Sequence, residues 1–271
     1  MFFQAITEYE FLQNAIFGLL LASLVCGMIG PFVVVQRIGY VAGSISHTML
    51  GGMGVAYYVG FSPLVGGLIS AVLAAIVVGF VGKGSAQGRD VAVGALWAVG
   101  MAVGVLFISM SPGYNADLMS YLFGNVLMIP RESLGSMLLL GAFVGVSIGF
   151  FYKSFVAVAF DEEFARLRGI PTQFFNYFLL ILVALAVVVL VQVVGLILVI
   201  ALLTLPAAVA LLFSQSLRHV MGLSMVFGLL FCMLGLWGSY HFNLPSGASI
   251  ILVAGSVYLL VWGFRGLLKE R

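Results

Sequence analysis

One imidazole stands within a long apolar stretch and is the side chain best suited to chemistry. His47 lies in the uncharged run 38–82, with Ser44 three residues earlier and Ser46 and Thr48 beside it. Ser44 and His47 share one face of a helix, and imidazole is the commonest metal ligand. A titratable side chain within a membrane span suggests function. Two interpretations stay open: a metal ligand with Ser44 and Ser46 as accessory oxygens, or a histidine bonded to a backbone carbonyl.

Two further polar residues are weaker candidates for metal contact. Asp117 suits a helix N-cap, because its carboxylate can accept hydrogen bonds from unpaired backbone donors. His241 precedes Pro245 in a loop and is more typical of an interfacial residue than of a ligand. Cys26 and Cys232 lie in apolar stretches without metal-ligand spacing, so we expect buried small side chains.

The segment Gly79–Ser85 has some likeness to a phosphate-binding loop but lacks its pattern. No glycine stands five residues before Gly82, and no serine or threonine follows Lys83 directly. The chain is therefore not expected to be an enzyme that hydrolyses ATP. Any ATP energy has to come from a partner.

The most polar stretch runs from position 161 to 171 and favours a short helix. Its acidic residues come first and its arginines last, as the helix dipole prefers, and glycine and proline then end it. A docking element for a cytosolic protein and a solvated loop are both compatible with this pattern. The residues in question include Asp161, Glu162, Glu163, Ala165, Arg166 and Gly169.

Composition shows which solvent surrounds these candidates. The 271 residues are 63% hydrophobic and 7% charged, with a mean hydropathy of +1.24, whereas soluble domains carry about 25% charged residues. Such a chain belongs in lipid, which excludes a soluble enzyme and a secreted disulfide scaffold. No basic run suggests nucleic acid. The first ten residues lack the basic region of a cleaved signal peptide.

The rare charges mark the ends of apolar runs that are long enough to span a membrane, which takes about 20 residues. The runs are apolar all round, so we expect helices and an all-α polytopic membrane protein rather than a β-barrel. The single transmembrane domain 1–271 then has nine spans, at about 11–36, 40–60, 63–82, 91–112, 133–152, 172–192, 195–213, 219–239 and 247–264.

Basic residues set the expected orientation, because they favour the cytoplasmic side. With the N-terminus outside and the C-terminus inside, ten of the eleven basic residues lie inside and only Arg131 lies outside. The segment 115–129 is amphipathic and fits a re-entrant or surface helix on the outer side. Glycines four residues apart, at Gly100/Gly104 and in the 141–149 stretch, favour tight packing within the chain over a sliding or dimer seam.

Four stretches, in order, resemble the permease subunits of bacterial ABC importers for zinc, manganese and iron(II). The resemblance covers roughly residues 19 to 260. The resemblance rests on Val35–Tyr40 running into the His47 segment, Asp117–Gly124, Arg168–Ile170, and Leu205–Ala208 with the later Pro245–Gly247.

The resemblance implies a homodimeric permease of the bacterial cytoplasmic membrane, surrounded by lipid. Two cytosolic ATPase subunits would use the ATP, and an extracytoplasmic metal-binding protein would dock near Asp117 and His241. The segment at about 160–169 would be the coupling helix that contacts the ATPase. No permanently bound cofactor is implied, because the metal ion is cargo.

His47 matches the histidine of the family's translocation path, but Gly43 stands where many members carry an aspartate. Loss of that anionic oxygen weights the site towards nitrogen, which favours zinc over manganese or iron(II) as cargo. The alternatives are an ion-coupled secondary carrier working without an ATPase, a permease for a metal chelate, and a structural membrane protein. The absence of acidic residues within spans argues against a carrier.

Overall fold

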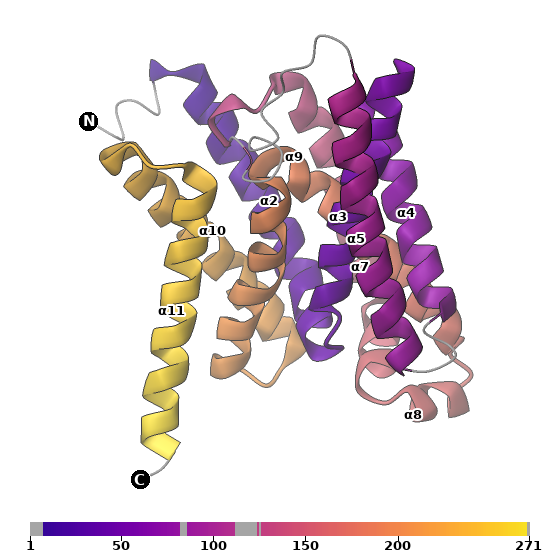
Figure 1. Ribbon diagram of the computed structural model, residues 1–271. Helices are drawn as coiled ribbons and strands as arrows, with labels where there is room; N and C mark the ends of the chain where they lie inside the picture. The colour runs from indigo at the N-terminus through magenta and orange to yellow at the C-terminus, as the bar shows by residue number, and fades with distance from the viewer. Residues whose placement is uncertain (1–7, 82–85, 112–123, 125, 270–271) are drawn as a thin grey trace. The chain divides into compact units, whose positions relative to one another are not determined.

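The computed structural model describes residues 8–81, 86–111, 124 and 126–269, and its regular elements in these ranges are helices. Figure 1 shows them along the chain. The chain divides into two compact units. One comprises Met1–Gln36, Leu118–Val146 and Val189–Arg271, and the other comprises Arg37–Asp117 and Ser147–Val188.

The first unit is built around α2 (Glu10–Val35), which packs against α10 (Leu217–Phe242). Helix α10 also packs against α11 (Ser246–Lys269), as Figure 1 shows. The helices approach closely where side chains are small. A Cβ on Gly235, for example, would lie 2.5 Å from Cα of Ile250. A short 3₁₀ turn, η1 (Val126–Met128), lies against α2 and α11.

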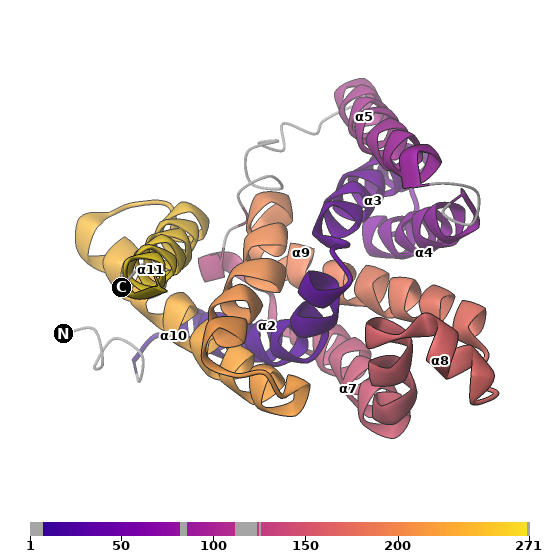
Figure 2. The same ribbon diagram turned by 90° about the horizontal axis from the view of Figure 1, so that it is seen from below.

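The second unit places α3 (Gly39–Val59) in contact with both α4 (Pro63–Val81) and α5 (Ala86–Met110). Figure 2 shows this arrangement from below. A Cβ on Gly51 or Gly54 would lie 2.8 Å from the carbonyl oxygen of Gly100 or Gly104. Tight packing within the chain, the interpretation favoured for Gly100 and Gly104, is therefore confirmed.

The glycines of the 141–149 stretch behave differently from one another. A Cβ on Gly141 would lie 3.0 Å from Val25, and one on Gly145 would lie 3.1 Å from Met28, so both pack on α2. Gly149 faces open space in the described chain. Only part of this stretch therefore serves helix packing within the unit.

Two long helices contain breaks. Helix α7 (Arg131–Phe160) kinks at Phe151, whose φ of −99° and ψ of 16° are not helical. Helix α9 (Thr172–Phe213) is interrupted at Gly195, where φ is +72° and ψ is 172°. A positive φ costs glycine little because it has no Cβ. The break separates two candidate spans, Thr172–Val191 and Val194–Phe213.

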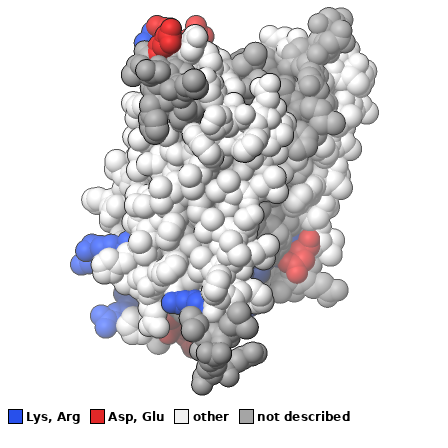
Figure 3. Space-filling view, turned by 90° about the vertical axis from the view of Figure 1, so that its left-hand side faces the viewer, with Lys and Arg blue, Asp and Glu red and all other residues white. Residues whose placement is uncertain are grey.

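Eight helical segments in the described residues are long and apolar enough to cross a membrane. Helix α3 has 21 residues, which is also long enough, but His47 and its hydroxyl neighbours make it more polar. On the face drawn in Figure 3, Lys, Arg, Asp and Glu side chains occur towards the ends and uncharged surface fills the middle. The predicted class, an all-helical polytopic membrane protein, is confirmed.

Candidate functional site

His47 lies on the face of α3 that meets α5. Its ring stacks on the indole of Trp97, with the ring centroids 4.5 Å apart and the planes at 23°. The side chain of His47 is half-buried, and Trp97 keeps 37% of its surface exposed. The imidazole is therefore held face-on against an aromatic partner from another helix.

Two hydroxyl groups attach α3 to α5 on the same face. Ser44 Oγ donates to the carbonyl oxygen of Val93 at 2.9 Å. Thr48 Oγ1 lies 3.2 Å from the carbonyl oxygen of Leu96 and 2.9 Å from that of Ser44. Hydrogen bonds between helices are favoured in lipid, where no water competes. They fix the register of α3 on α5 around His47.

Nδ1 of the His47 ring has no hydrogen-bond partner among the described residues. Nδ1 is buried without one, so the alternative of a histidine bonded to a backbone carbonyl is not what the structure shows. No group of three or more His, Cys, Asp or Glu residues that could hold a metal ion occurs in the described part of the chain. One chain thus offers a single imidazole rather than a cage.

Ser44 and Ser46 are both fully buried, and their hydroxyl protons are in use. Ser44 bonds to α5, and Ser46 Oγ donates to the carbonyl oxygen of Ala42 at 2.9 Å. Each oxygen keeps a lone pair that can accept. Their role as accessory ligands stays a prediction. Gly43 is buried one turn before His47.

The two weaker candidates, Asp117 and His241, belong to other parts of the chain than the His47 pair. Asp117 lies outside the described residues, as does most of the segment 115–129. His241 lies in the last turn of α10, in the other unit, and is exposed. Its ring meets the edge of Trp237, with centroids 5.2 Å apart and planes at 77°.

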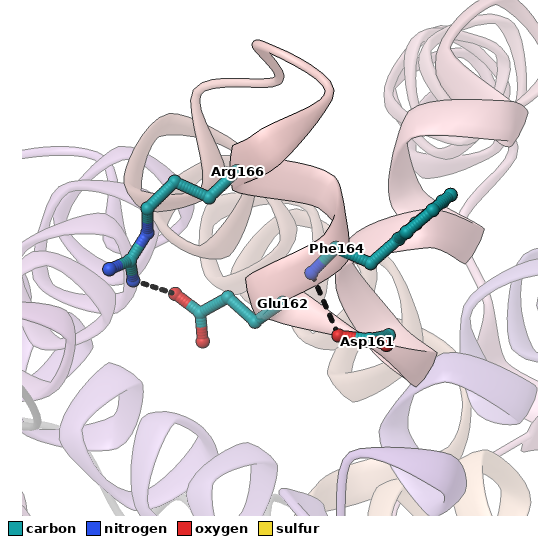
Figure 4. A network of polar contacts seen from close by, with 4 residues as sticks. All are labelled: Asp161, Glu162, Phe164 and Arg166. Carbon is teal, nitrogen blue, oxygen red and sulfur yellow. Dashed lines mark hydrogen bonds and ion pairs between the residues drawn. The ribbon is translucent and has the colours of Figure 1, made fainter.

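The polar segment after α7 folds as a short helix with both ends capped. In α8 (Glu162–Leu167), Asp161 Oδ1 accepts a hydrogen bond of 2.8 Å from the backbone N–H of Phe164. An ion pair of 3.6 Å joins Glu162 to Arg166 one turn later, as Figure 4 shows. The N-cap bond satisfies a donor that would otherwise lack a partner.

Glycine ends α8 for a conformational reason. Gly169 has a φ of +77°, and its N–H donates to the carbonyl oxygen of Arg166 at 3.0 Å. The N–H of Ile170 donates to the carbonyl oxygen of Ala165, also at 3.0 Å. These two bonds form a Schellman motif. The predicted helix over this stretch therefore has a defined start and stop.

The surface of α8 is partly apolar. Ala165 is fully buried, whereas Leu167 is 83% and Phe164 is 48% exposed. The guanidinium of Arg168 lies 5.0 Å from the centre of the Phe164 ring. The sequence predicted a short amphipathic helix here from its charged residues, but it did not indicate that Phe164 and Leu167 form the exposed apolar part.

An aromatic cluster supports the two helices that flank α8. Ring centroids in the cluster lie 5.3–5.9 Å apart, and Phe155 is almost fully buried. Its members come from α7 and the start of α9: Phe151, Phe155, Phe174, Phe175 and Phe178. The ends of the α8 segment are thereby anchored on rigid helices.

Known proteins share both this sequence and this arrangement. The chain is 42% identical to an uncharacterized membrane protein of Synechocystis sp., over 95% of this chain and 92% of that protein. It is 35% identical to the manganese transport system membrane protein MntC of Halalkalibacterium halodurans, over 97% and 90%. The structure of PsaBC from Streptococcus pneumoniae in complex with Fab matches with a TM-score of 0.87 and 32% identity, covering 96% and 94%.

The helical fold and these similarities define a permease subunit of a metal ABC importer, a multi-pass protein of the cytoplasmic membrane. More particularly, the chain belongs to the ABC 3 transport family, whose model matches residues 8–265. It is not an enzyme, since the ATPase of such importers is a separate partner. Membership of this family therefore replaces the alternative of a secondary carrier that works without an ATPase.

Proposed function

We propose that this permease imports a divalent transition-metal ion, with Mn²⁺ as its principal cargo. The support comes from relatives that cover nearly the whole chain and are named for manganese, MntC and the import permease ScaB of Streptococcus gordonii. These names do not support the zinc preference expected from Gly43. Zn²⁺ and Fe²⁺ are accordingly treated as competing ions.

The observation that carries the proposal is the environment of His47. Its imidazole is half-buried on a span-length helix and stacks on Trp97, and its Nδ1 has no described hydrogen-bond partner. Nδ1 is buried, so Nε2 is the ring nitrogen that a ligand can reach. A passing metal ion is such a ligand, because it binds the lone pair of neutral imidazole.

A single histidine suits transport better than storage. Conduction requires binding that is favourable enough for entry and weak enough for release. Because one chain offers no cluster of three ligands in its described residues, we infer a transient site. We further propose a homodimer, in which each copy contributes one His47 and water supplies the remaining ligands.

Helix α8 is proposed as the coupling helix that docks on the ATPase. Its exposed Phe164 and Leu167 would enter an apolar groove, and Glu162 and Arg166 would contact its polar rim. Caps at both ends let a six-residue helix move as one piece, although isolated helices of this length are marginal. ATP binding by the partner would then move α8 and the helices beside it.

Vectorial transport also needs delivery from outside. We propose an extracytoplasmic metal-binding protein that docks on the outer loops, with Asp117 and His241 as its predicted contacts. His241 is exposed beside Asn243, which ends α10 in a left-handed conformation with φ of +57°. Such a loop presents its side chains to a partner.

Uptake into proteoliposomes tests the cargo. The permease would be reconstituted with its ATPase and supplied with the binding protein and Mn²⁺, Zn²⁺ or Fe²⁺, with and without ATP. The proposal expects ATP-dependent accumulation of Mn²⁺ at the lowest half-saturating concentration. Accumulation of Zn²⁺ alone would return the cargo to the expectation from Gly43, and uptake unaffected by ATP would contradict the proposal altogether.

A further inference from the structure

We propose that Trp97 is the positioning residue of the metal contact: its indole fixes the plane of the His47 ring and so sets how strongly the ion is held. The inference rests on the proposed metal-binding role of His47. It concerns the half-buried pair formed by one side chain of α3 and one of α5, 4.5 Å apart.

No hydrogen bond from Nδ1 to a described residue orients the imidazole. Metal-binding histidines almost always donate their second N–H to a carboxylate, a carbonyl or water, which fixes the ring. Here Nδ1 is buried and has no such partner among the described residues. The terminal torsion of histidine is broad, so another contact has to restrict it. The near-parallel stack at 23° does so, because rotation of the imidazole would drive its edge into the indole.

The pairing of α3 and α5 holds Trp97 in place independently of the stack. Ser44 and Thr48 bond to the carbonyl oxygens of Val93 and Leu96, within the turn that leads to Trp97. One turn further on, a Cβ on Gly100 would lie 2.6 Å from Cα of Thr48. Hydrogen bonds between the helices before Trp97 and a close backbone contact after it thus hold this part of α5 against α3. Its replacement should alter the ring contact while leaving the two helices paired.

The indole of Trp97 does not lie in the hydrophobic core of its unit. Trp97 keeps 37% of its surface exposed, whereas the hydrophobic core residues of this unit, such as Met49 and Ile45, are fully buried. The indole covers one face of the imidazole and leaves the rest of its own surface open, as Val99 and Leu106 do on the same helix. Stacking orients the ring without the negative charge that a carboxylate would add, which keeps the site weak.

The chain offers a matched control in a second tryptophan–histidine pair. Trp237 meets His241 at 77°, one turn apart on the same helix. An edge contact between exposed rings does not define a plane against which the imidazole is held. Replacement of Trp237 should therefore leave metal uptake unchanged. An equal effect of both replacements would instead indicate a general consequence of losing an aromatic ring.

The test uses the reconstituted permease–ATPase complex with Mn²⁺ as the probe. In Trp97→Leu the KM for Mn²⁺ uptake should rise about tenfold, the lower end of the effect of losing a residue that orients a ligand, while Vmax with saturating Mn²⁺ changes little. Trp97→Phe, which restores a stacking ring, should return the KM to near the wild-type value. Trp237→Leu should have no effect. His47→Gln serves as the reference for a lost ligand.

A spectroscopic measurement applies even if Trp97→Leu fails to fold. The double variant W237F/W262F leaves Trp97 as the only tryptophan. Co²⁺ bound at the neighbouring imidazole should quench its fluorescence, Mn²⁺ should compete with Co²⁺, and addition of His47→Gln should abolish the quenching. The same experiment on W97F/W262F with His241→Gln, which reports on Trp237 without its neighbouring imidazole, should show no saturable quenching.

The outcomes separate the two claims. If Trp97→Leu transports like the wild type while His47→Gln is impaired, the positioning role is wrong and the metal role of His47 stands. If Trp97→Phe is as impaired as Trp97→Leu, the stack is not the cause and the positioning role is also wrong. If His47→Gln neither impairs uptake nor changes the quenching, both claims fall.

Discussion

Residue-scale chemistry concentrates on His47 and the three hydroxyl side chains around it, Ser44, Ser46 and Thr48. Their spacing placed Ser44 and His47 on one face of a helix, and both contact α5. The partners themselves could not be predicted, because Val93, Leu96 and Trp97 lie about 50 residues further along the chain. No local pattern indicates which carbonyl a buried serine will find. The shared helix face of Ser44 and His47 could therefore be predicted from the sequence, but the stacking of His47 on Trp97 could not.

Introducing an acidic ligand beside His47 should change the cargo preference. Gly43→Asp places a carboxylate one turn before the imidazole, and manganese prefers oxygen ligands. We expect a lower KM for Mn²⁺, a smaller change for Zn²⁺, and a lower Vmax because tighter binding slows release. Uptake kinetics with both ions measure this. Gly43→Asn, similar in volume and uncharged, is the control, and an equal response from it would contradict the electrostatic explanation.

At the scale of elements, backbone breaks were predictable where glycine or proline causes them. The sequence favoured a break near residues 192–195, and α9 is interrupted at Gly195, where φ is positive. Proline begins α4 at residue 63. The kink falls on Phe151, two residues after Gly149, and the ring of Phe151 packs against Phe175 and Phe178 from α9. Tertiary packing determines that kink, and local sequence does not contain it.

The close approach of α3 and α5 should be sensitive to one methyl group. In Gly100→Ala the new Cβ would lie 2.6 Å from Cα of Thr48 and 2.9 Å from the carbonyl oxygen of His47. Because backbone atoms cannot yield cheaply, we expect a loss of about 1–3 kcal/mol of stability. Thermal unfolding of the purified complex measures it.

Gly94→Ala on the same helix is the matched control for this comparison. Nothing in the described structure lies within 4 Å of a Cβ at position 94, and alanine favours a helix over glycine by up to about 1 kcal/mol. Gly94→Ala should therefore be neutral or stabilising. Equal melting temperatures for the two variants would show that the α3–α5 contact is looser than the structure has it.

The cap of α8 should matter for coupling to the ATPase. Asp161→Ala removes the acceptor for the Phe164 N–H, which costs about 1 kcal/mol in helix stability. Frayed α8 should bind the ATPase subunit more weakly and lower the uptake per ATP hydrolysed. Asp161→Asn, which keeps a capping oxygen, should behave like the wild type. The affinity between the purified permease and ATPase subunits would be measured for both variants. Equal affinities for Asp161→Ala and Asp161→Asn would contradict the role of the cap.

For the whole molecule, composition and charge spacing were sufficient to predict a polytopic helical protein, since uninterrupted apolar runs of about 20 residues span lipid as helices. Helix α3 shows why a hydropathy criterion alone finds only eight candidates. Its hydroxyl groups and His47 make it polar, but the hydroxyls bond to carbonyl oxygens inside the protein. The orientation with the N-terminus outside stays a prediction from the basic residues.

Labelling from each side of the membrane tests that orientation. The native thiols of Cys26 and Cys232 are fully buried and should not react with a membrane-impermeant maleimide. A cysteine introduced by Glu163→Cys should react only from the cytoplasmic side, and one introduced by Leu244→Cys only from the outside. Both positions are exposed. Reaction of both from the same side would overturn the nine-span topology.

The most direct test of the central claim compares wild type with His47→Gln in proteoliposomes that contain the permease, its ATPase and the binding protein. Mn²⁺ uptake and ATP hydrolysis would be recorded together. We predict that His47→Gln loses most of its Mn²⁺ uptake while its ATP hydrolysis continues, because the α8 docking element is intact and the metal contact is gone. Wild-type uptake by His47→Gln at every Mn²⁺ concentration would contradict the assignment of His47 as that contact.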